Sequence, residues 1–300
     1  MYHYVRDLPN TPYPRIKGML SSSFGAQVDR LVSRYEMVDF AKAVAYLKAE
    51  YRTGRELCLL TFDDGLMDHY DTVVPMLVER NLSGVFGLIS DCTDGNRVAS
   101  VHKIHYLMAT LEGEEFAKQL AKRSRAMGLP KLGEVEQSTA SAAYQYDTPV
   151  DALMKYYLNY VVSVDEKERL VSGLFAAHFG KDEEFAKELY LDWGKAREMQ
   201  DAGMTIAPHG KTHANLGNLS VEEQRIEIAE SMSAVETNIG SNSSTRSFVF
   251  PYGDHGAFSD KTVQVANEVG IEWCFTTLPI QNTPEGDSRL IGRIDTNEVE

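Results

Sequence analysis

The stretch LCLLTFDDG, residues 57–65, combines an uninterrupted apolar run with two adjacent acids, Asp63 and Asp64. Apolar residues at successive positions, instead of alternating ones, are typical of a strand that is buried on both faces, as in a parallel sheet. A helical segment over residues 71–81 and a second apolar strand segment over residues 83–90 follow. A strand, a helix and a strand in this order predict a β-α-β unit with a right-handed crossover, and hence an α/β fold.

Outward from this unit, the chain separates into an α/β part and a helical part. Residues 91–190 are rich in Ala, Glu, Lys, Leu and Tyr, and their apolar residues recur at helical spacing, so these helices need a partner that buries them. From residue 191 strands and helices alternate again, with the apolar strand segments MTIAP, SFVF, WCFTT and RLIGRI. We therefore predict a domain formed by residues 1–90 and 191–300, and a helical insertion, residues 91–190, that acts as a lid or a cleft wall.

Composition and charge exclude several classes of function. The 300-residue chain has a formal net charge of −14, and an acidic surface repels phosphate backbones and anionic membranes, so we expect no nucleic-acid partner. No run approaches the roughly 18 apolar residues of a membrane-spanning helix. Met1 is not followed by a basic and apolar leader, so we expect a cytoplasmic protein without an integral membrane segment. Three cysteines without close spacing do not predict a disulfide framework.

A second polar motif, HGKTH at residues 209–213, also follows an apolar strand segment. The carboxyl ends of parallel strands meet at one edge of a fold, so these histidines should lie near Asp63 and Asp64. Histidines four residues apart can converge on one ion across a helical turn. Two imidazoles and one carboxylate, with open coordination positions, are typical of a hydrolytic metal centre, for which Zn²⁺ is the usual ion. Taken alone, the two acids would equally suit an N-cap and a solvated carboxylate at the start of the next helix.

A third motif, FPYGDH at residues 250–255, follows the apolar segment SFVF. Pro251 fixes φ and removes a backbone donor, while Gly253 permits a sharp turn. Such a loop can direct a backbone N–H into a site, where it would stabilise an oxyanion. By itself, the same sequence suits an ordinary Pro-Gly turn.

The motifs TFDDG, HGKTH and FPYG occur in this order, and with them the chain resembles the polysaccharide deacetylase family (carbohydrate esterase family four, the NodB-like domain). Tyr70 and Pro75 stand where the family's helix after the two acids commonly has Tyr and Pro. Residues 192–216, DWGKAREMQDAGMTIAPHGKTHANL, are similar to the family's helix-strand-histidine unit. The resemblance covers about residues 1–90 and 191–293, and it leaves the helical insertion unmatched.

This resemblance implies a distorted (β/α)7-like barrel and a division of roles at the site. Asp64, His209 and His213 would bind a divalent metal, with Zn²⁺ expected and Co²⁺, Ni²⁺ or Fe²⁺ as alternatives. Asp63 would act as the general base, and the backbone N–H of Tyr252 would stabilise the oxyanion. The implied reaction removes an acetyl group from an N-acetylated sugar or saccharide precursor, in surface polysaccharide or O-antigen assembly.

Two positions depart from the family pattern. The segment SRLIGRIDTNEVE has no histidine where many members place their general acid, and our candidate is His3, because some members look circularly permuted and carry this histidine near the N-terminus. His3 would equally suit a strand histidine that bonds a backbone carbonyl. Val249 replaces an arginine that steadies the base in many members. Arg293 or Arg246 could substitute for it, although each would also suit a surface ion pair.

Three other histidines are predicted to lie outside the metal site, and two alternative functions stay open. His69 is predicted to lie at the rim or on the surface, and His102 and His105 are not expected to form a second metal site, because no acids accompany them. One alternative function is the same metal site acting on a non-sugar amide or a formamide. Another is a glycan-binding member without turnover.

Overall fold

The computed structural model describes residues 1–145, 147–240, 246–284 and 289–299. The chain divides into two compact units, which we call the α/β unit and the helical unit. The α/β unit comprises Met1–Asp7, Gly18–Arg97 and Ala186–Glu300, and the helical unit comprises Leu8–Lys17 and Val98–Phe185. Compared with the segments expected from the sequence, residues 8–17 join the helical unit, and residues 91–97 and 186–190 join the α/β unit.

The named strands of the α/β unit all pair in parallel. One sheet has the order β5 (Leu60–Phe62), β6 (Gly84–Leu88), β7 (Thr205–Pro208), and another has the order β10 (Leu290–Ile291), β9 (Trp273–Phe275), β8 (Ser247–Val249). Two smaller pairs consist of β1 (Val5–Arg6) with β2 (Met19–Leu20) and of β3 (Glu36–Met37) with β4 (Leu57–Cys58). The predicted β-α-β unit is confirmed by the parallel register of β5 and β6, in which Thr61 lies opposite Val85.

The predicted α/β class is confirmed, but the ladders do not form one closed ring. Among the described residues, the strands form four separate sheets, so strand pairing alone does not give the expected (β/α)7-like barrel. Tyr2 adds an extended segment beside β5 through an isolated parallel bridge to Phe62.

The two three-stranded sheets share one apolar cluster. Val85 of β6, Ala207 of β7, Val249 of β8 and Phe275 of β9 are all buried in it, together with the apolar face of α2 (Phe40–Leu47). Successive side chains of a strand point to opposite faces, so the neighbours of these four residues along each strand point away from the shared cluster.

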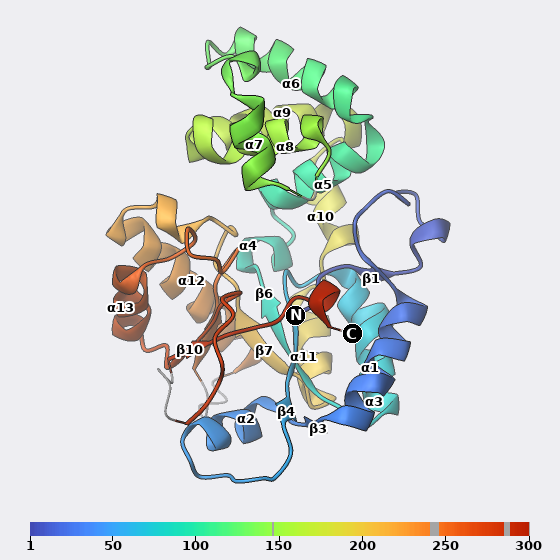
Figure 1. Ribbon diagram of the computed structural model, residues 1–300, viewed down its shortest axis with the longest axis vertical. Coiled ribbons are helices and arrows are strands. Elements are labelled where there is room, and N and C mark those ends of the chain that lie inside the picture. Colours follow the sequence, from blue (N-terminus) through green and yellow to red (C-terminus); the bar gives the residue numbers. More distant parts are fainter. Residues whose placement is uncertain (146, 241–245, 285–288, 300) are drawn as a thin grey trace. The chain divides into compact units, whose positions relative to one another are not determined.

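Helices cover the opposite face of each sheet. Phe62 and Phe86 pack against a first group of helices, and Phe248 and Cys274 pack against a second group. The first group consists of α1 (Ser21–Arg34), α3 (Val74–Glu79) and α11 (Trp193–Asp201), and the second consists of α12 (Val221–Ile239) and α13 (Asp260–Val269). The two groups lie on opposite sides of β6 and β7 in Figure 1. Because both faces of the sheets are buried, the strands are apolar at successive positions.

Local capping explains where several helices begin and end. The Asp39 carboxylate accepts a hydrogen bond from the Lys42 N–H at the start of α2. The Ser220 hydroxyl accepts one from the Glu223 N–H at the start of α12, within a capping box. α12 ends at Ile239, and the next residue, Gly240, has a φ of +93°, a conformation that favours glycine. These caps satisfy backbone groups that a helix end would otherwise leave without partners.

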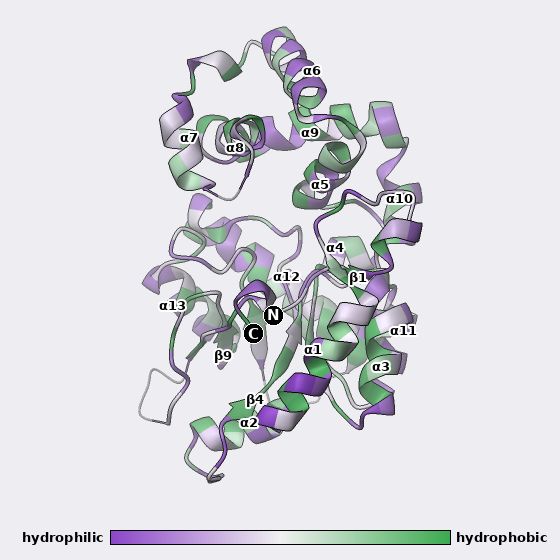
Figure 2. Ribbon diagram, turned by 45° about the vertical axis from the view of Figure 1, so that its right-hand side comes forward, coloured by the Kyte–Doolittle hydropathy of each residue, from purple (hydrophilic) through white to green (hydrophobic). Residues whose placement is uncertain are grey.

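The helical unit contains α5 (Ser100–Thr110), α6 (Gly113–Ala126), α7 (Gln137–Ala143), α8 (Pro149–Tyr156) and α9 (Val164–Phe179), while α10 (Asp182–Leu189) contains the chain boundary between the units. Its core includes Leu107, Phe116 and Phe175, none of which is exposed. Hydrophilic and hydrophobic residues alternate along α6 in Figure 2, as expected for a helix that buries one face. Among the described residues, no helix is both long and apolar enough to cross a membrane.

Candidate metal centre and active site

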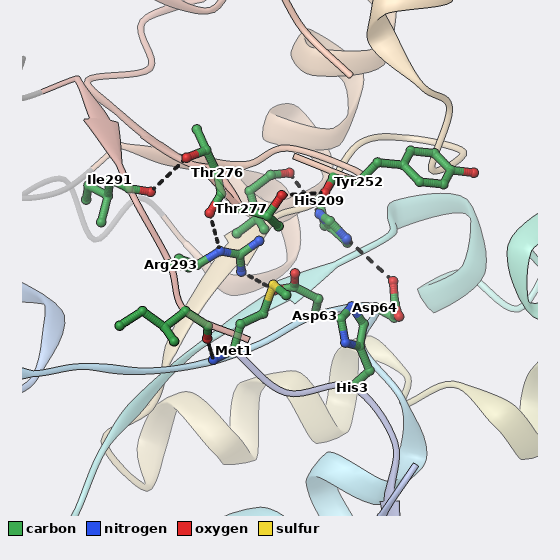
Figure 3. A network of polar contacts seen from close by, with 12 residues as sticks. Met1, His3, Asp63, Asp64, His209, Tyr252, Thr276, Thr277, Ile291 and Arg293 are labelled. Carbon is green, nitrogen blue, oxygen red and sulfur yellow. Dashed lines mark hydrogen bonds and ion pairs between the residues drawn. The ribbon is translucent and has the colours of Figure 1, made fainter. Parts of the chain in front are cut away.

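Polar residues from several loops meet at the carboxyl ends of strands in the α/β unit (Figure 3). Asp63 and Asp64 follow β5, His209 follows β7, Tyr252 follows β8, and Arg293 follows β10. The strands are parallel within each sheet, so their carboxyl ends lie at one edge, where ligands and catalytic groups bind in α/β folds.

Asp64, His209 and His213 form a group whose ligand atoms all lie within 4.8 Å of one another. Asp64 Oδ1 is 3.5 Å from His209 Nε2 and 3.4 Å from His213 Nε2. All three side chains are nearly inaccessible to solvent. Elsewhere in the described ranges, no other group of three or more acidic, histidine or cysteine side chains converges in this way, and His102 and His105 are not members of one.

The two histidines do not converge across a helical turn, which corrects the expectation from their spacing. Residues 209–213 form an irregular loop in which Gly210 has a φ of +76° and His213 a φ of +64°. Asp64 also has a positive φ, of +83°. A non-glycine residue in this region costs on the order of 1–3 kcal/mol, so the surrounding structure must hold Asp64 and His213 in place. A tight loop, and not a helix, therefore brings the two imidazoles together.

The hydrogen bond of His209 indicates what the three side chains together can hold. Its Nδ1 atom is 2.8 Å from the carbonyl oxygen of Val249, so Nδ1 is the donor, and a neutral ring presents the lone pair of Nε2 to Asp64. A lone pair and a carboxylate oxygen facing each other at 3.5 Å repel unless a cation lies between them. Two imidazoles and a carboxylate also match the donor set of hydrolytic metal sites. The residues present therefore fit a divalent metal ion.

The electrostatic potential at this site is negative. Burial lowers the pKa of His209, but the carboxylates of Asp64 and Asp63 outweigh burial and raise the pKa above its ordinary value. A field that favours a proton on the imidazole also favours a metal cation beside it.

The carboxylate of Asp63 pairs with an arginine. Arg293 Nη1 donates to Asp63 Oδ1 at 2.6 Å, and Arg293 Nε donates to the carbonyl of Thr276 at 3.0 Å. Both partners are buried, with exposed fractions of 3% for Asp63 and 7% for Arg293. Burial by itself raises the pKa of Asp63, but the charge of Arg293, with contributions from His209 and His3, lowers it to about 2. Asp63 is therefore a carboxylate at neutral pH.

Replacing Arg293 by Met is expected to lower the free energy of unfolding by about 3–5 kcal/mol at neutral pH, because the Asp63 carboxylate stays buried without its counter-charge. In the wild-type chain the pKa of Asp63 is about 2, below the ordinary value of 3.8. The pair therefore stabilises the fold above the ordinary pKa and loses this contribution as the pH falls toward the lowered one. In the variant, burial raises the pKa, so the stability difference should shrink in mild acid, as measured by urea unfolding.

The double variant Asp63→Asn, Arg293→Met is the matched control for this prediction. It removes both charges and should regain much of the stability that the single Arg293→Met variant loses. Equal stability of the single and double variants at neutral pH would show that the ion pair does not stabilise the fold.

The FPYG loop holds Tyr252 against one of the proposed metal ligands. Tyr252 has a φ of +63°, and its ring centroid is 5.0 Å from that of His213. The Thr277 hydroxyl donates to the Tyr252 carbonyl at 3.2 Å. Gly253 is needed at the next position, because a Cβ there would lie 2.9 Å from the backbone nitrogen of Thr277. The segment that follows β9 thus fixes the conformation of the loop.

The N-terminal segment brings His3 to the edge of this site. The Tyr2 N–H donates to the carbonyl of Thr61, and the Asp63 N–H donates to the carbonyl of Tyr2, both at 2.9 Å. His3 is exposed, and its ring lies beside the two acids in Figure 3. It is close enough for its charge to contribute to the lowered pKa of Asp63.

His69 is buried, which corrects the expectation of a rim or surface position. Its exposed fraction is 0%, and its ring packs against Phe62 and Phe86 with centroid distances of 5.7 and 5.6 Å. Its Nε2 atom lies 3.0 Å from the carbonyl oxygen of His3. The sequence pattern assumed a regular α-helix here, whereas His69–Val73 form a π-helical turn, which changes the face that each residue presents. His69 therefore ties the segment that carries His3 to the start of this helix.

Comparisons with known proteins agree with this geometry. Residues 157–274 match a family model described as polysaccharide deacetylase, a range that contains the HGKTH and FPYG motifs. The resemblance to the polysaccharide deacetylases is confirmed. A comparison with curated proteins found no match.

Several solved structures of deacetylases are similar to the chain over nearly its whole length. The deacetylase PplD of Streptococcus pyogenes, solved in complex with acetate, has a TM-score of 0.58 and 15% identity, with 98% of this chain and 89% of that chain covered. IcaB of Ammonifex degensii has a TM-score of 0.58 and 17% identity, with coverage of 99% and 91%. A de-N-acetylase of Aggregatibacter actinomycetemcomitans has a TM-score of 0.57 and 16% identity, with coverage of 98% and 92%. At these identities the likeness concerns the fold.

The sequence left open whether Arg293 or Arg246 takes the place of the family's arginine beside the base. The structure distinguishes the two. Arg293 pairs with Asp63, whereas Arg246 is half exposed and lies 4.0 Å from Glu236. Glu227 was missed altogether, although it contacts the HGKTH loop. The signal for Glu227 was available, because it is an acid on the buried stripe of α12, where most helices carry apolar residues.

Proposed function

We propose that this chain is a metal-dependent deacetylase that removes the acetyl group from an N-acetylated sugar. The observation that supports this most strongly is the convergence of Asp64, His209 and His213 at strand ends. Beside them lies Asp63, a separate ionised carboxylate held by Arg293. A set of metal ligands and an independent base are the two requirements of metal-assisted hydrolysis. The choice of a sugar amide as substrate draws on the similarity to polysaccharide deacetylases.

We infer that Asp64 Oδ1 and the Nε2 atoms of His209 and His213 would hold the ion. Zn²⁺ suits a set of two imidazoles and one carboxylate, and Co²⁺, Ni²⁺ or Fe²⁺ are alternatives with the same donors. When bound, the ion would polarise the acetyl carbonyl and acidify the attacking water. The Val249 carbonyl fixes the tautomer of His209, as partners behind metal-binding histidines commonly do.

The remaining steps of the proposal fall to residues of the chain. Asp63 takes a proton from the attacking water as the oxygen of this water bonds to the acetyl carbon. With a pKa of about 2, Asp63 is a weak base, so it needs an acidified water. The Tyr252 N–H donates to the carbonyl oxygen as that oxygen becomes negative. The C–N bond then breaks, and the leaving amine takes a proton from the His3 imidazolium, giving acetate and a free amino sugar.

We also propose that the two three-stranded sheets belong to a distorted (β/α)7-like barrel. Their shared apolar cluster, which includes Val85 and Val249, would be its interior. The N-terminal segment supports closure, because Tyr2 bridges to β5 while the Met1 nitrogen donates to the carbonyl of Ile294 at 3.0 Å, beyond β10. The site would then lie at the carboxyl-end mouth of the barrel, where catalytic groups gather in such folds.

Acetate release tests the proposed activity. With Zn²⁺ supplied, we expect equal amounts of acetate and free amine from at least one N-acetylated sugar, in a panel of free, nucleotide-linked, lipid-linked and polymeric forms. Removal of the ion with a chelator should abolish release, and added metal should restore it, because the chain alone lacks a Lewis acid. The same sugars without the acetyl group serve as the blank.

The same experiment separates the rival functions. Release of formate or another acid from non-sugar amides, without acetate from any sugar, would assign the site to a different amide. Binding of glycans by the metal-loaded chain without any release would identify a binding protein. Activity that persists after the metal has been removed would contradict the metal-dependent proposal.

A further inference from the structure

The loop that carries the two histidines is held by its backbone from two sides. The His209 N–H donates to the Leu88 carbonyl at 2.8 Å, which continues the ladder between β6 and β7. Two carbonyls of the loop, those of Gly210 and Lys211, accept hydrogen bonds from the Ser90 and Asp91 N–H groups of α4 (Ser90–Thr93) at 3.2 and 3.0 Å. Two further backbone donors of the loop, the N–H groups of Lys211 and Thr212, bond a side chain of α12.

One carboxylate of α12, Glu227, accepts hydrogen bonds from two backbone N–H groups and one hydroxyl of the loop. Its Oε2 atom accepts from the Lys211 N–H at 3.0 Å and from the Thr212 N–H at 2.9 Å, and its Oε1 atom accepts from the Thr212 hydroxyl at 2.7 Å. The side chain is buried, with an exposed fraction of 7%. A Cβ at Gly210 would lie only 3.4 Å from Glu227 Oε2 and 3.3 Å from Pro251 Cγ, so the loop is packed closely against this carboxylate.

The position of these bonds in the chain matters, because they lie between the two proposed ligands. His213 follows Thr212 directly and has a φ of +64°, a backbone conformation that is unfavourable for a residue other than glycine. Bonds to a charged acceptor are stronger than those between neutral groups, so Glu227 can offset the strain of this conformation. Without the hydrogen bonds to Glu227, the loop would relax and the Nε2 atom of His213 would move away from Asp64.

We propose that Glu227 is a positioning residue that preorganises the two-histidine loop for metal binding. This inference rests on the proposed function only in taking Asp64, His209 and His213 as metal ligands. Glu227 lies behind the ligands and bonds only the peptide groups and hydroxyl of residues 211 and 212 in this loop. Its effect therefore reaches the ion through the loop. Its place on α12, a 19-residue helix with a capping box, gives the loop a rigid support.

Metal affinity of the whole chain is the direct readout. We expect Glu227→Leu to weaken Zn²⁺ binding by roughly 10–100-fold, the usual cost of losing a partner behind the ligands. Competition with a chromogenic chelator measures the affinity, and the visible absorption of the Co²⁺ form reports the coordination geometry. Neither measurement needs a substrate.

Two variants separate positioning from general effects of charge. Glu227→Gln keeps the shape and can keep an oxygen facing the two N–H groups, but it loses the charge that strengthens these bonds. It should therefore bind Zn²⁺ more weakly than the wild-type chain and more tightly than Glu227→Leu. A Gln variant as weak as the Leu variant would overturn the positioning role, because the charge alone would then carry the effect. Glu230→Leu is the matched control one turn along α12, since Glu230 is exposed and pairs with the Lys211 ammonium, not with the loop backbone, among the contacts of the described residues. It should leave the affinity unchanged.

A third variant keeps the test decisive if Glu227→Leu does not fold. Thr212→Val removes one of the three hydrogen bonds and leaves the carboxylate in place, so a smaller loss of affinity is expected. Wild-type affinity in Thr212→Val and in a folded Glu227→Leu variant would overturn the inference. A wild-type chain that binds neither Zn²⁺ nor Co²⁺ would instead contradict the proposed metal centre itself, and the two failures are thus distinguishable.

Discussion

Asp63→Asn is expected to retain the metal ion and to lower the rate of acetate release by roughly 10²–10⁴-fold, the range that a general base contributes. The amide has the size of the carboxylate, and its carbonyl can still accept the hydrogen bond from Arg293, so the ligands should stay in place. What it cannot do is take a proton from the attacking water. Turnover under saturating substrate and Zn²⁺ titration of the same preparation measure the two properties.

Asp71→Asn is the matched control for this variant. Asp71 lies on the segment that follows the acid pair, but it is exposed, so the same chemical change there should leave turnover unchanged. An Asp63→Asn chain with near wild-type turnover would remove Asp63 from the mechanism. Loss of the metal in this variant would instead make Asp63 a ligand.

His213→Ala should lose both the metal and turnover, with a larger drop in Zn²⁺ affinity than the roughly 10–100-fold expected for partners behind the ligands. The variant removes one of three donor atoms that lie within 4.8 Å of one another. It also replaces a residue at φ +64° by Ala, which does not favour this conformation either. Zn²⁺ competition and acetate release, followed together, should therefore fall in parallel.

His178→Ala provides the comparison for His213→Ala. His178 is exposed in the helical unit, where it contacts Gln119, and its loss should change neither metal affinity nor turnover. Undiminished Zn²⁺ binding by His213→Ala would be incompatible with the three-ligand centre, even if turnover were lost. That outcome would leave His213 a role in contacting substrate.

The features that could be predicted from the sequence depend on short stretches of chain. The uninterrupted apolar run before Asp63 predicted a buried parallel strand, and β5 and β6 pair in parallel. The segments MTIAP, SFVF and WCFTT each contain a strand, β7, β8 and β9. Strand and helix periods are local properties, so they can be recognised before any packing is known. The same holds for the donor atoms of the HGKTH motif, which are fixed by residue type.

The features that could not be predicted depend on backbone conformation and on distant contacts. The spacing of His209 and His213 suggested a helical turn, but the positive φ of His213 belongs to a loop that only its surroundings can hold. The burial of His69 follows from a π-helical turn, which no periodicity in the sequence distinguishes from an α-helix. Residues 8–17 join the helical unit although most of that unit begins at residue 98.

The sequence by itself determined the α/β class, the strand that ends at the two acids, and the set of residue types that could bind a metal. Tertiary structure decided which groups meet: Arg293, not Arg246, reaches Asp63 across 230 positions of the chain, and Glu227 reaches the loop between the histidines. The physical reason is the distance along the chain over which each factor acts. Apolar periodicity, capping and donor chemistry act over a few residues, whereas the partner of a buried charge depends on how all the strands and helices pack.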